Sequence, residues 1–331
     1  ISQGPSGYGM FEYSGLSIMA AHDNTTVQVD KDANGSYETT VVLDEGEATL
    51  VSGILQGARV MSDKAVQVVL VTGDIGSNYG SRDMTLLPLD IWGSSYWSPV
   101  GNSGYTSGNY TSGPTVLYLY NPSTNGNIYI TCERYLSPTI TMGPVAPRGV
   151  LTTTLRTING VDQGAHCFAS TSGGVATADR IFAVGTVDSS INSGASDGRT
   201  WDWSFTLYPD SFLTTDALTL LGLGKDPTDT SSTQNGSPLW ATVTCRTYMY
   251  VDWNNDGVAD KVDLNGDGDT LDTVDGINEN TSDQGMLVNP LQSVRLYRPV
   301  RDVSPFDQTG ARVWTRTASG AGYGGTPGCK L

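Results

Sequence analysis

The sequence predicts an all-β protein of one or two β-sandwich domains, jelly-roll or immunoglobulin-like, with a calcium-binding loop inserted between strands. Stretches with strand character recur along the 331-residue chain, and its 40 glycines supply many turns. Only residues 211–221 show a helical pattern, with Asp210 or Ser211 as cap and Gly222 as stop. We therefore expect antiparallel sheets joined by short connections.

The strands follow from alternation of apolar and polar residues. They are expected at residues 25–29, 39–43, 48–51, 65–71, 115–120, 127–132, 180–187, 201–208, 241–251, 293–298 and 311–315. The first two flank a turn that contains Asn34-Gly35, a favoured hairpin pair. The strands at 115–120 and 127–132 flank an Asn-Pro…Asn-Gly turn, which predicts a second hairpin.

Two stretches interrupt the series of strands. Residues 101–113 form a Gly/Ser/Tyr-rich segment, and residues 225–238 are polar and rich in turn formers. They suggest three parts: 1–110 and 111–238, which form one or two sandwiches, and 239–331, which carries the calcium loops. The chain starts abruptly at Ile1 without a signal peptide, so we expect a processed or trimmed chain.

Composition excludes some partners. The net charge is −16, and a surface of that sign repels nucleic acid and anionic membranes. No apolar run reaches the roughly 20 residues of a membrane span. We expect no nucleic-acid partner and no direct membrane span.

Residues 252–263 read DWNNDGVADKVD, the pattern of a calcium loop. Oxygen-bearing side chains occupy positions one, three, five, nine and twelve, Gly257 allows the sharp turn at position six, and position seven offers a carbonyl. The expected ligands are Asp252, Asn254, Asp256, Val258, Asp260 and Asp263. A strand leads into this loop, so we expect a structural clamp between strands and not a helix-flanked calcium sensor.

A second loop overlaps the first, with Asp263 closing one and opening the other. Positions nine and twelve of this loop are Leu271 and Val274, which cannot ligate through their side chains. Acidic residues follow each by one position, so the further expected ligands are Asn265, Asp267, Asp269, Asp272 and Asp275. We expect one Ca²⁺, with the overlapping loop as the candidate for a second; the alternative is a solvated acidic loop.

The four cysteines are Cys132, Cys167, Cys245 and Cys329. Their spacing is not that of a zinc or redox motif. An even number beside a calcium loop favours an oxidising compartment and one or two disulfides, with three pairings open. Buried free thiols are the alternative.

Catalytic residues are not expected. The two histidines are His22 and His166, and the sequence has no Gly-x-Ser-x-Gly motif to supply a nucleophile. Glutamates are scarce, and nothing in the pattern brings two carboxylates into a shared cleft. No glycine-rich phosphate loop follows a strand.

Residues 19–29, 41–47 and 57–66 carry a Thr-Thr-Val strand, a Leu-x-x-Gly-Glu turn and a Gly-x-x-Val-x-Ser-Asp-Lys element. These features resemble the domain at the N-terminus of IgG-Fc-binding protein, which also occurs in many bacterial surface proteins. Ala65 replaces the family's usual proline. Residues 250–257, 290–295 and 307–314 are similar to a module of large, repeat-bearing secreted bacterial proteins. The resemblance supplies no catalytic residue.

We therefore expect a non-catalytic, calcium-stabilised structural protein of a bacterial cell-surface layer or filament, secreted and assembling with itself as a homopolymer. The N-terminal run 1–9 and the apolar segment 10–19 are a candidate strand donor or linker. The alternative is a surface adhesin or carbohydrate-binding module that contacts glycans or other surface proteins. Its stacking residues would be Trp92, Trp97, Tyr105 and Tyr110.

Overall fold

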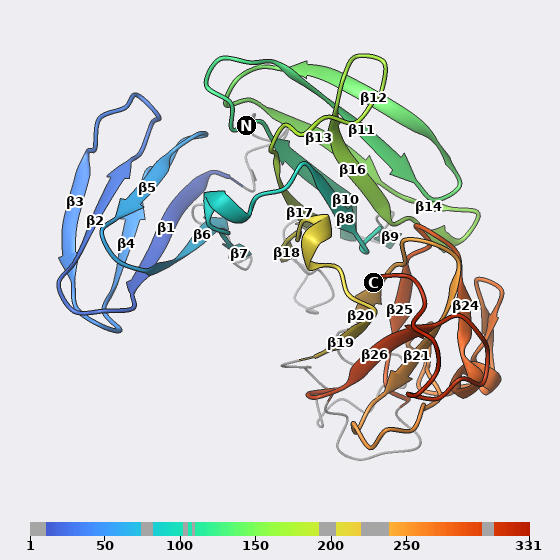
Figure 1. Ribbon diagram of the computed structural model, residues 1–331. Coiled ribbons are helices and arrows are strands. Elements are labelled where there is room, and N and C mark those ends of the chain that lie inside the picture. The colour runs from blue at the N-terminus through green and yellow to red at the C-terminus, as the bar shows by residue number, and fades with distance from the viewer. Residues whose placement is uncertain are drawn as a thin grey trace.

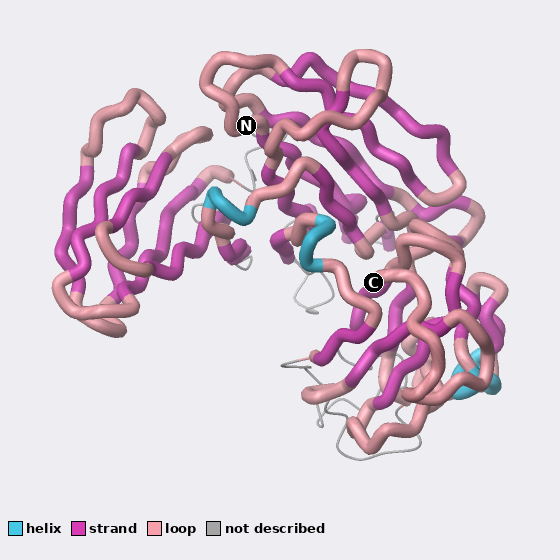
Figure 2. The backbone as a smooth tube through the Cα atoms, in the orientation of Figure 1, coloured by secondary structure: helices cyan, strands magenta, loops and turns pink. Residues whose placement is uncertain are grey.

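The computed structural model describes residues 11–73, 82–101, 105–107, 110–191, 203–219, 238–299 and 308–331. Side chains of residues 105–107, 110–113, 188–191 and 203 lie outside the description. Within the described part, strands dominate and all helical segments are short 3₁₀ helices: η1 (Leu89–Ile91), η2 (Asp210–Phe212) and η3 (Glu279–Gln284). The all-β prediction is confirmed, and Figures 1 and 2 show three β-rich lobes in chain order.

The first lobe packs two antiparallel sheets, ordered β4-β1-β6-β7 and β3-β2-β5. Their strands are β1 (Tyr13–Ala20), β2 (Thr25–Asp30), β3 (Thr39–Leu43), β4 (Ala48–Ser52), β5 (Arg59–Ser62), β6 (Val66–Gly73) and β7 (Arg82–Thr85). Alternate residues such as Ile18, Val27 and Val29 point between the sheets and are fully buried. The hairpin predicted around Asn34-Gly35 is confirmed, since β2 pairs with β3.

The middle lobe is a larger sandwich. Its sheets run β13-β10-β17-β18, with β9 added to β10, and β12-β11-β16-β8. The strands are β8 (Ser95–Ser98), β9 (Tyr105–Ser107), β10 (Tyr110–Tyr120), β11 (Ile128–Arg134), β12 (Ser137–Val145), β13 (Val150–Leu155), β16 (Ala165–Ser170), β17 (Phe182–Ile191) and β18 (Trp203–Thr206). The core between them contains Tyr96, Leu117, Leu119, Ile130 and Leu155, all nearly inaccessible.

The third lobe holds the calcium-loop sequence. Its main sheet is β19-β26-β21-β24, beside the pair β20-β25. The strands are β19 (Asp216–Leu218), β20 (Leu239–Ala241), β21 (Thr247–Asp252), β24 (Met286–Val288), β25 (Val294–Leu296) and β26 (Arg312–Arg316), with the small hairpin β22 (Thr273–Val274)–β23 (Ile277–Asn278). Another small hairpin, β14 (Thr157–Ile158)–β15 (Val161–Asp162), follows β13 in the middle lobe. Val262 and Leu264, from the loop region, are buried in this lobe's core.

Two sequence-based expectations are wrong. Residues 211–221 do not form a helix in their described part, because η2 ends at Phe212 and β19 then pairs with β26. The segments 115–120 and 127–132 are not a hairpin, because β10 pairs with β13 and β17 whereas β11 pairs with β12 and β16. The connection crosses between sheets, and the Asn121 side-chain amide holds it by donating to three carbonyls, of Gly126, Val145 and Ala146.

The N-terminal segment is also not a free strand donor over its described length. Strand β1 lies in the interior of its sheet, with β4 on one side and β6 on the other. Residues 1–10 of that prediction lie outside the described residues. Over β1, the chain's own neighbours take the hydrogen bonds that a donated strand would offer.

The expected domain boundaries fall close to strands that bridge them. Strand β8 precedes the boundary near residue 110 but pairs with β16 of the middle lobe. Strand β19 precedes the boundary near residue 238 but pairs with β26 of the third lobe. The division into 1–110, 111–238 and 239–331 stays a prediction.

Side chains connect neighbouring lobes. Ser204 and Thr206 of β18 donate their hydroxyls to the carbonyls of Asp83 and Thr85 on β7. The middle and third lobes are joined by the ion pair between Arg295 and the buried Asp162, at 2.9 Å. None of the helices in the described residues has the length and hydrophobicity to cross a membrane.

Candidate functional site

The first calcium-loop sequence leaves β21 at Asp252, the last residue of the strand. Two backbone positions in the loop have positive φ, Asn255 at 55° and Gly257 at 89°. Glycine favours this left-handed conformation, and asparagine tolerates it better than most residues. The sharp turn predicted at position six is therefore present, and it folds the chain back around the Asp252 carboxylate.

Backbone N–H groups converge on the side-chain oxygens of this loop. Asp252 accepts from Asp256 N–H at 3.2 Å and from Gly257 N–H at 2.8 Å. Asp256 accepts from Val258 N–H at 2.9 Å, and Asp260 reaches back to accept from Trp253 N–H at 2.8 Å. Position nine is thus held against the start of the loop. Asp252, Asp256 and Asp260 are not among the groups of described carboxylates whose oxygens lie within 4.8 Å of one another.

The second loop repeats this arrangement around Asp263, which is fully buried. One carboxylate oxygen of Asp263 accepts from Gly266 N–H at 2.6 Å, and the other accepts from Gly268 N–H at 2.7 Å. The oxygens of Asp263 therefore face the second loop. Its proposed double role, as the last ligand of the first loop and the first of the second, stays a prediction.

The best-formed group of carboxylates lies in the second loop. Single oxygens of Asp267, Asp269 and Asp272 lie within 4.8 Å of one another. Oxygens bound at about 2.3–2.6 Å to one Ca²⁺ can be no more than roughly 5 Å apart, so this group fits a hard divalent cation. Asn265 donates to Asp272 at 2.8 Å and orients it toward the loop.

Asp275 lies in different surroundings from the other expected ligands. It lines a small cavity of about 120 Å³ together with Asp162 and Arg295. Burial raises its pKa, the charge of Asp162 raises it further, and Arg295 opposes the rise. Asp275 is not in the group formed by Asp267, Asp269 and Asp272.

Glu279 is a residue that sequence reasoning missed. It is fully buried, and its carboxylate accepts from Leu264 N–H at 2.6 Å and from Asp272 N–H at 3.1 Å. Glu279 therefore holds both ends of the second loop, although it lies beyond the twelve positions of the calcium-loop pattern. Its position in η3 follows from the chain reversal at β22–β23, which no loop consensus encodes.

The electrostatic state of the loops favours a positive ion. Burial raises the pKa of Asp260, and the negative charges of Asp252 and Asp256 add to the rise. Burial likewise raises the pKa values of Asp263 and Glu279. Crowded carboxylates with partial burial hold protons more tightly, and a divalent cation would relieve the same repulsion.

A third loop, between β2 and β3, has the same construction. Residues 30–38 read DKDANGSYE, with oxygen side chains at positions one, three, five and nine and glycine at six. Asp30 accepts from Asn34 N–H at 3.1 Å and Gly35 N–H at 3.0 Å, and Glu38 accepts from Lys31 N–H at 2.7 Å. These bonds join the positions that are joined around Asp252.

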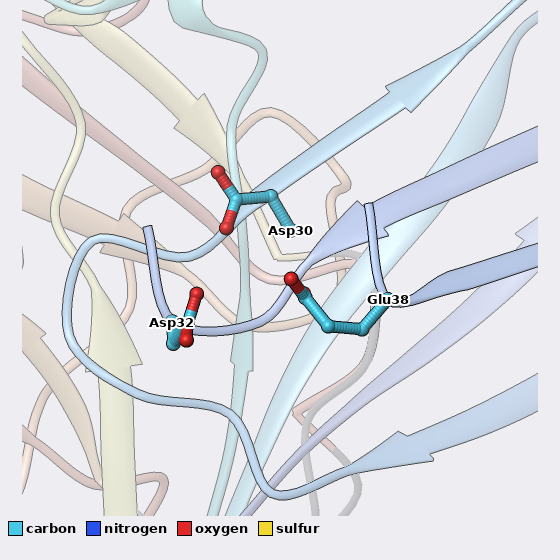
Figure 3. A group of neighbouring side chains, drawn as sticks. All are labelled: Asp30, Asp32 and Glu38. Atoms are coloured by element: carbon cyan, nitrogen blue, oxygen red, sulfur yellow. The ribbon is translucent and has the colours of Figure 1, made fainter. Parts of the chain in front are cut away.

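Figure 3 shows Asp30, Asp32 and Glu38 gathered around this loop, and single oxygens of the three lie within 4.8 Å of one another. Positive φ occurs at the equivalent positions, Ala33 at 63° and Gly35 at 92°. The sequence analysis interpreted Asn34-Gly35 as a hairpin pair and overlooked the loop, although the spacing of its oxygens matches that from Asp252.

All four cysteines are paired. Cys132 is bonded to Cys167 across the adjacent strands β11 and β16, where the two residues face each other. Cys245 is bonded to Cys329 and ties the last described segment to the chain just before β21. Of the alternatives left open by the sequence, the structure has two disulfides and no free thiol.

The expected stacking aromatics do not form one platform. Trp92 stacks on Phe182 at 4.6 Å and donates its indole N–H to the Leu87 carbonyl, so it packs where the first and middle lobes meet. Trp97 lies on the opposite sheet, on β8, stacked on His166 at 4.4 Å. The side chains of Tyr105 and Tyr110 lie outside the described residues.

Comparison with known proteins identifies one family. The family model described as IgGFc binding protein matches residues 3–186, which is more than half of the chain. The match covers the first lobe and most of the middle lobe. No match was found among curated proteins or among solved structures. The chain belongs to the IgGFc-binding protein family.

Proposed function

We propose that the protein is an extracellular, calcium-stabilised structural component of a bacterial cell-surface layer or filament, and that it assembles with copies of itself through its β-sandwiches. The observation that carries the calcium part is the pair of consecutive loops from Asp252 to Asp272, in which backbone N–H groups organise carboxylates of high charge density. A solvated acidic loop would not require its carboxylates to be held in place by backbone N–H groups in this way.

Family membership supports the extracellular part. The family's name describes binding to part of an immunoglobulin, which is an extracellular protein, and so indicates a surface or binding protein. The two disulfides agree with an oxidising compartment. The name belongs to the family, and immunoglobulin binding is not part of the proposal.

Calcium would act by bracing the third lobe. Val262 and Leu264 belong to the hydrophobic core of this lobe and lie between the ligands of the two loops. An ion that fixes the loops would therefore fix these core residues too. Binding to the folded state alone stabilises by RT ln(1 + [Ca²⁺]/Kd), about 2.7 kcal/mol at a hundredfold excess over Kd.

Self-assembly would use the edge strand β3. It pairs only with β2 within its sheet, contains neither charge nor proline, and carries Val42, which is 61% exposed. Natural edge strands are commonly protected by lysine, proline or a bulge. An unprotected edge offers backbone hydrogen bonds to a second copy.

The proposal is tested with the full chain in calcium by sedimentation and electron microscopy. We expect assemblies in calcium that dissociate in chelator, and we expect Val42→Lys to reduce them. Val175→Lys is the matched control, because Val175 is similarly exposed at 67% but lies in a loop outside every strand. A wild-type chain that stays monomeric at every concentration in calcium overturns the self-assembly proposal.

A second candidate is an adhesin or carbohydrate-binding module. The observation in its favour is that Trp97, His166 and Phe168 gather on the outer face of one sheet, near the carboxylates of Glu133 and Asp210. If the protein has this role, the wild type should bind at least one glycan on an array, and Trp97→Ala should no longer bind it. An array without any bound glycan rejects it.

A further inference from the structure

Three side chains on neighbouring strands of the middle lobe form a hydrogen-bonded chain. Ser95 Oγ on β8 lies 2.6 Å from Nε2 of His166 on β16. The other ring nitrogen, Nδ1, lies 3.0 Å from Oε2 of Glu133 on β11. The order is hydroxyl, imidazole and carboxylate, which is the order of a serine nucleophile with its base and the group that orients the base.

The register of the sheet produces this order. His166 faces Trp97 on one neighbouring strand and Glu133 on the other, and Ser95 lies two residues before Trp97. Because side chains alternate along a strand, Ser95, Trp97, His166 and Glu133 share the outer face of the sheet. Their strand neighbours Tyr96, Cys132 and Cys167 point inward to the core.

The imidazole is held firmly. Trp97 stacks on it at 4.4 Å with an interplanar angle of 18°, and Phe168 packs against it at 5.1 Å. The disulfide between Cys132 and Cys167 joins the residues next to Glu133 and His166, so it fixes the two strands directly beneath the pair. The His166 side chain retains 18% exposure.

The carboxylates define the tautomer. An ionised Glu133 can only accept, so Nδ1 carries the proton and Nε2 is left to accept from the Ser95 hydroxyl. Asp210, on η2, places Oδ2 3.8 Å from Nε2.

We propose that Ser95 is a nucleophile toward small carboxylic esters, with His166 as general base and Glu133 as the positioning residue. Ser95 Oγ forms a bond to the acyl carbon while Nε2 takes its proton. The bond from that carbon to the alcohol oxygen then breaks, and the imidazolium returns the proton to the departing alcohol. Water attacks the acyl-serine with the same base, which releases the acid and restores the Ser95 hydroxyl.

The site differs from the calcium loops in position and in chemistry. Its groups lie in the middle lobe, and its nearest acidic residues are Glu133 and Asp210, neither of which belongs to a loop described above. The ester reaction should therefore proceed equally in calcium and in chelator. A result of the esterase test can therefore be told apart from a result of the calcium-dependent assembly test.

The test uses the full chain with p-nitrophenyl acetate and, separately, a fluorophosphonate probe followed by peptide mass spectrometry. We expect ester hydrolysis above the buffer rate and an adduct on Ser95. Ser95→Ala and His166→Ala should each lower the rate by about a hundredfold or to background. Ser62→Ala is the matched control, because Ser62 is an exposed serine at the end of strand β5 and should leave the rate unchanged.

Glu133→Gln distinguishes positioning from mere folding. Loss of the carboxylate removes the charge that faces the ring while it carries the proton of Ser95, so kcat should fall while KM for the ester stays unchanged. Hydrolysis by Ser95→Ala at the wild-type rate overturns the proposal. So does a fluorophosphonate adduct on another residue, or no adduct on the folded wild-type chain.

Discussion

The Asp252 carboxylate accepts the backbone N–H of Gly257 at 2.8 Å, and this bond closes the turn at the start of the acidic loop from Asp252 to Asp263. Asp30 and Gly35 repeat the bond at 3.0 Å in the first lobe. In both loops glycine has a positive φ, near 90°. The two loops therefore share the same local hydrogen bond. Because they lie in different lobes, a substitution in one loop can be used to measure its contribution to stability separately.

Asp256→Ala should remove most of the stabilisation by calcium. Asp256 is the ligand expected at position five and also holds Val258 N–H. We expect the melting temperature in calcium to fall to near the value that the wild type shows in chelator. Asp283→Ala removes the same charge from the same lobe, outside both loops, and is the control. If chelator leaves the wild-type melting temperature unchanged, the calcium proposal is wrong.

Asp30→Ala should destabilise the first lobe even without metal. Asp30 is 2% exposed and satisfies the N–H groups of Asn34 and Gly35. Asn34 N–H keeps its second bond, to Asp32 at 3.1 Å, so only Gly35 N–H loses this carboxylate partner and we expect a cost of about 1 kcal/mol. Urea unfolding in chelator measures the change. Asp44→Ala, at an exposed carboxylate beyond β3, should cost less, and equal losses would contradict the role of Asp30.

Replacing Cys245 and Cys329 by serine should destabilise the third lobe. The bond closes a span of 84 residues, and the chain-entropy model gives about 4–5 kcal/mol for a loop of this length. The reason is that the unfolded chain gains freedom when the link is lost. Urea unfolding with and without reductant measures the effect. Reductant should lower the free energy of unfolding of this lobe in the wild type and should have no further effect on it in the variant.

The protein should lose stability above about pH 10. Burial raises the pKa values of the Tyr96, Tyr250 and Tyr297 phenols above the ordinary value of a tyrosine, about 10. The folded state therefore keeps these phenols protonated where the unfolded chain releases protons, so the contribution is complete below pH 10 and is lost as the pH rises through the folded values. Urea midpoints on both sides of pH 10, with tyrosinate absorbance, measure it.

Tyr96→Phe tests one of these phenols. Its hydroxyl donates to the Ile181 carbonyl at 2.9 Å and accepts from Gly93 N–H at 3.1 Å. The variant should lose about 1–3 kcal/mol at neutral pH, because both backbone groups lose their partner. It should also show a smaller further loss above pH 10. An unchanged alkaline loss would assign the effect to the other tyrosines.

Local patterns predicted what depends on local chemistry. The strands at 25–29 and 39–43, the hairpin between them and the turn at Gly257 all follow from alternation and from residue conformational preference. The loop around Asp30 carried the same spacing as the predicted one. It could have been recognised from the sequence, but the Asn34-Gly35 pair suggested a simpler turn.

Other features depend on contacts between distant segments. The strands at 115–120 and 127–132 flank good turn residues, but burial of Leu119 and Ile130 in one core sends them to opposite sheets. Residues 211–219, the described part of the expected helix, do not form one because β19 pairs with β26. Ser95, Glu133 and His166 meet only through sheet register, which no spacing along the chain reveals.

The cross-strand disulfide has a mechanical consequence. A pulling force that peels β11 from β16 meets a covalent link between Cys132 and Cys167, which encloses a span of 35 residues. At about 3.4 Å of contour for each residue, roughly 120 Å of chain is withheld from extension. If the chain is pulled, segments outside this covalent link should therefore extend first. The sheet face that bears His166 should keep its structure while other parts of the chain unfold.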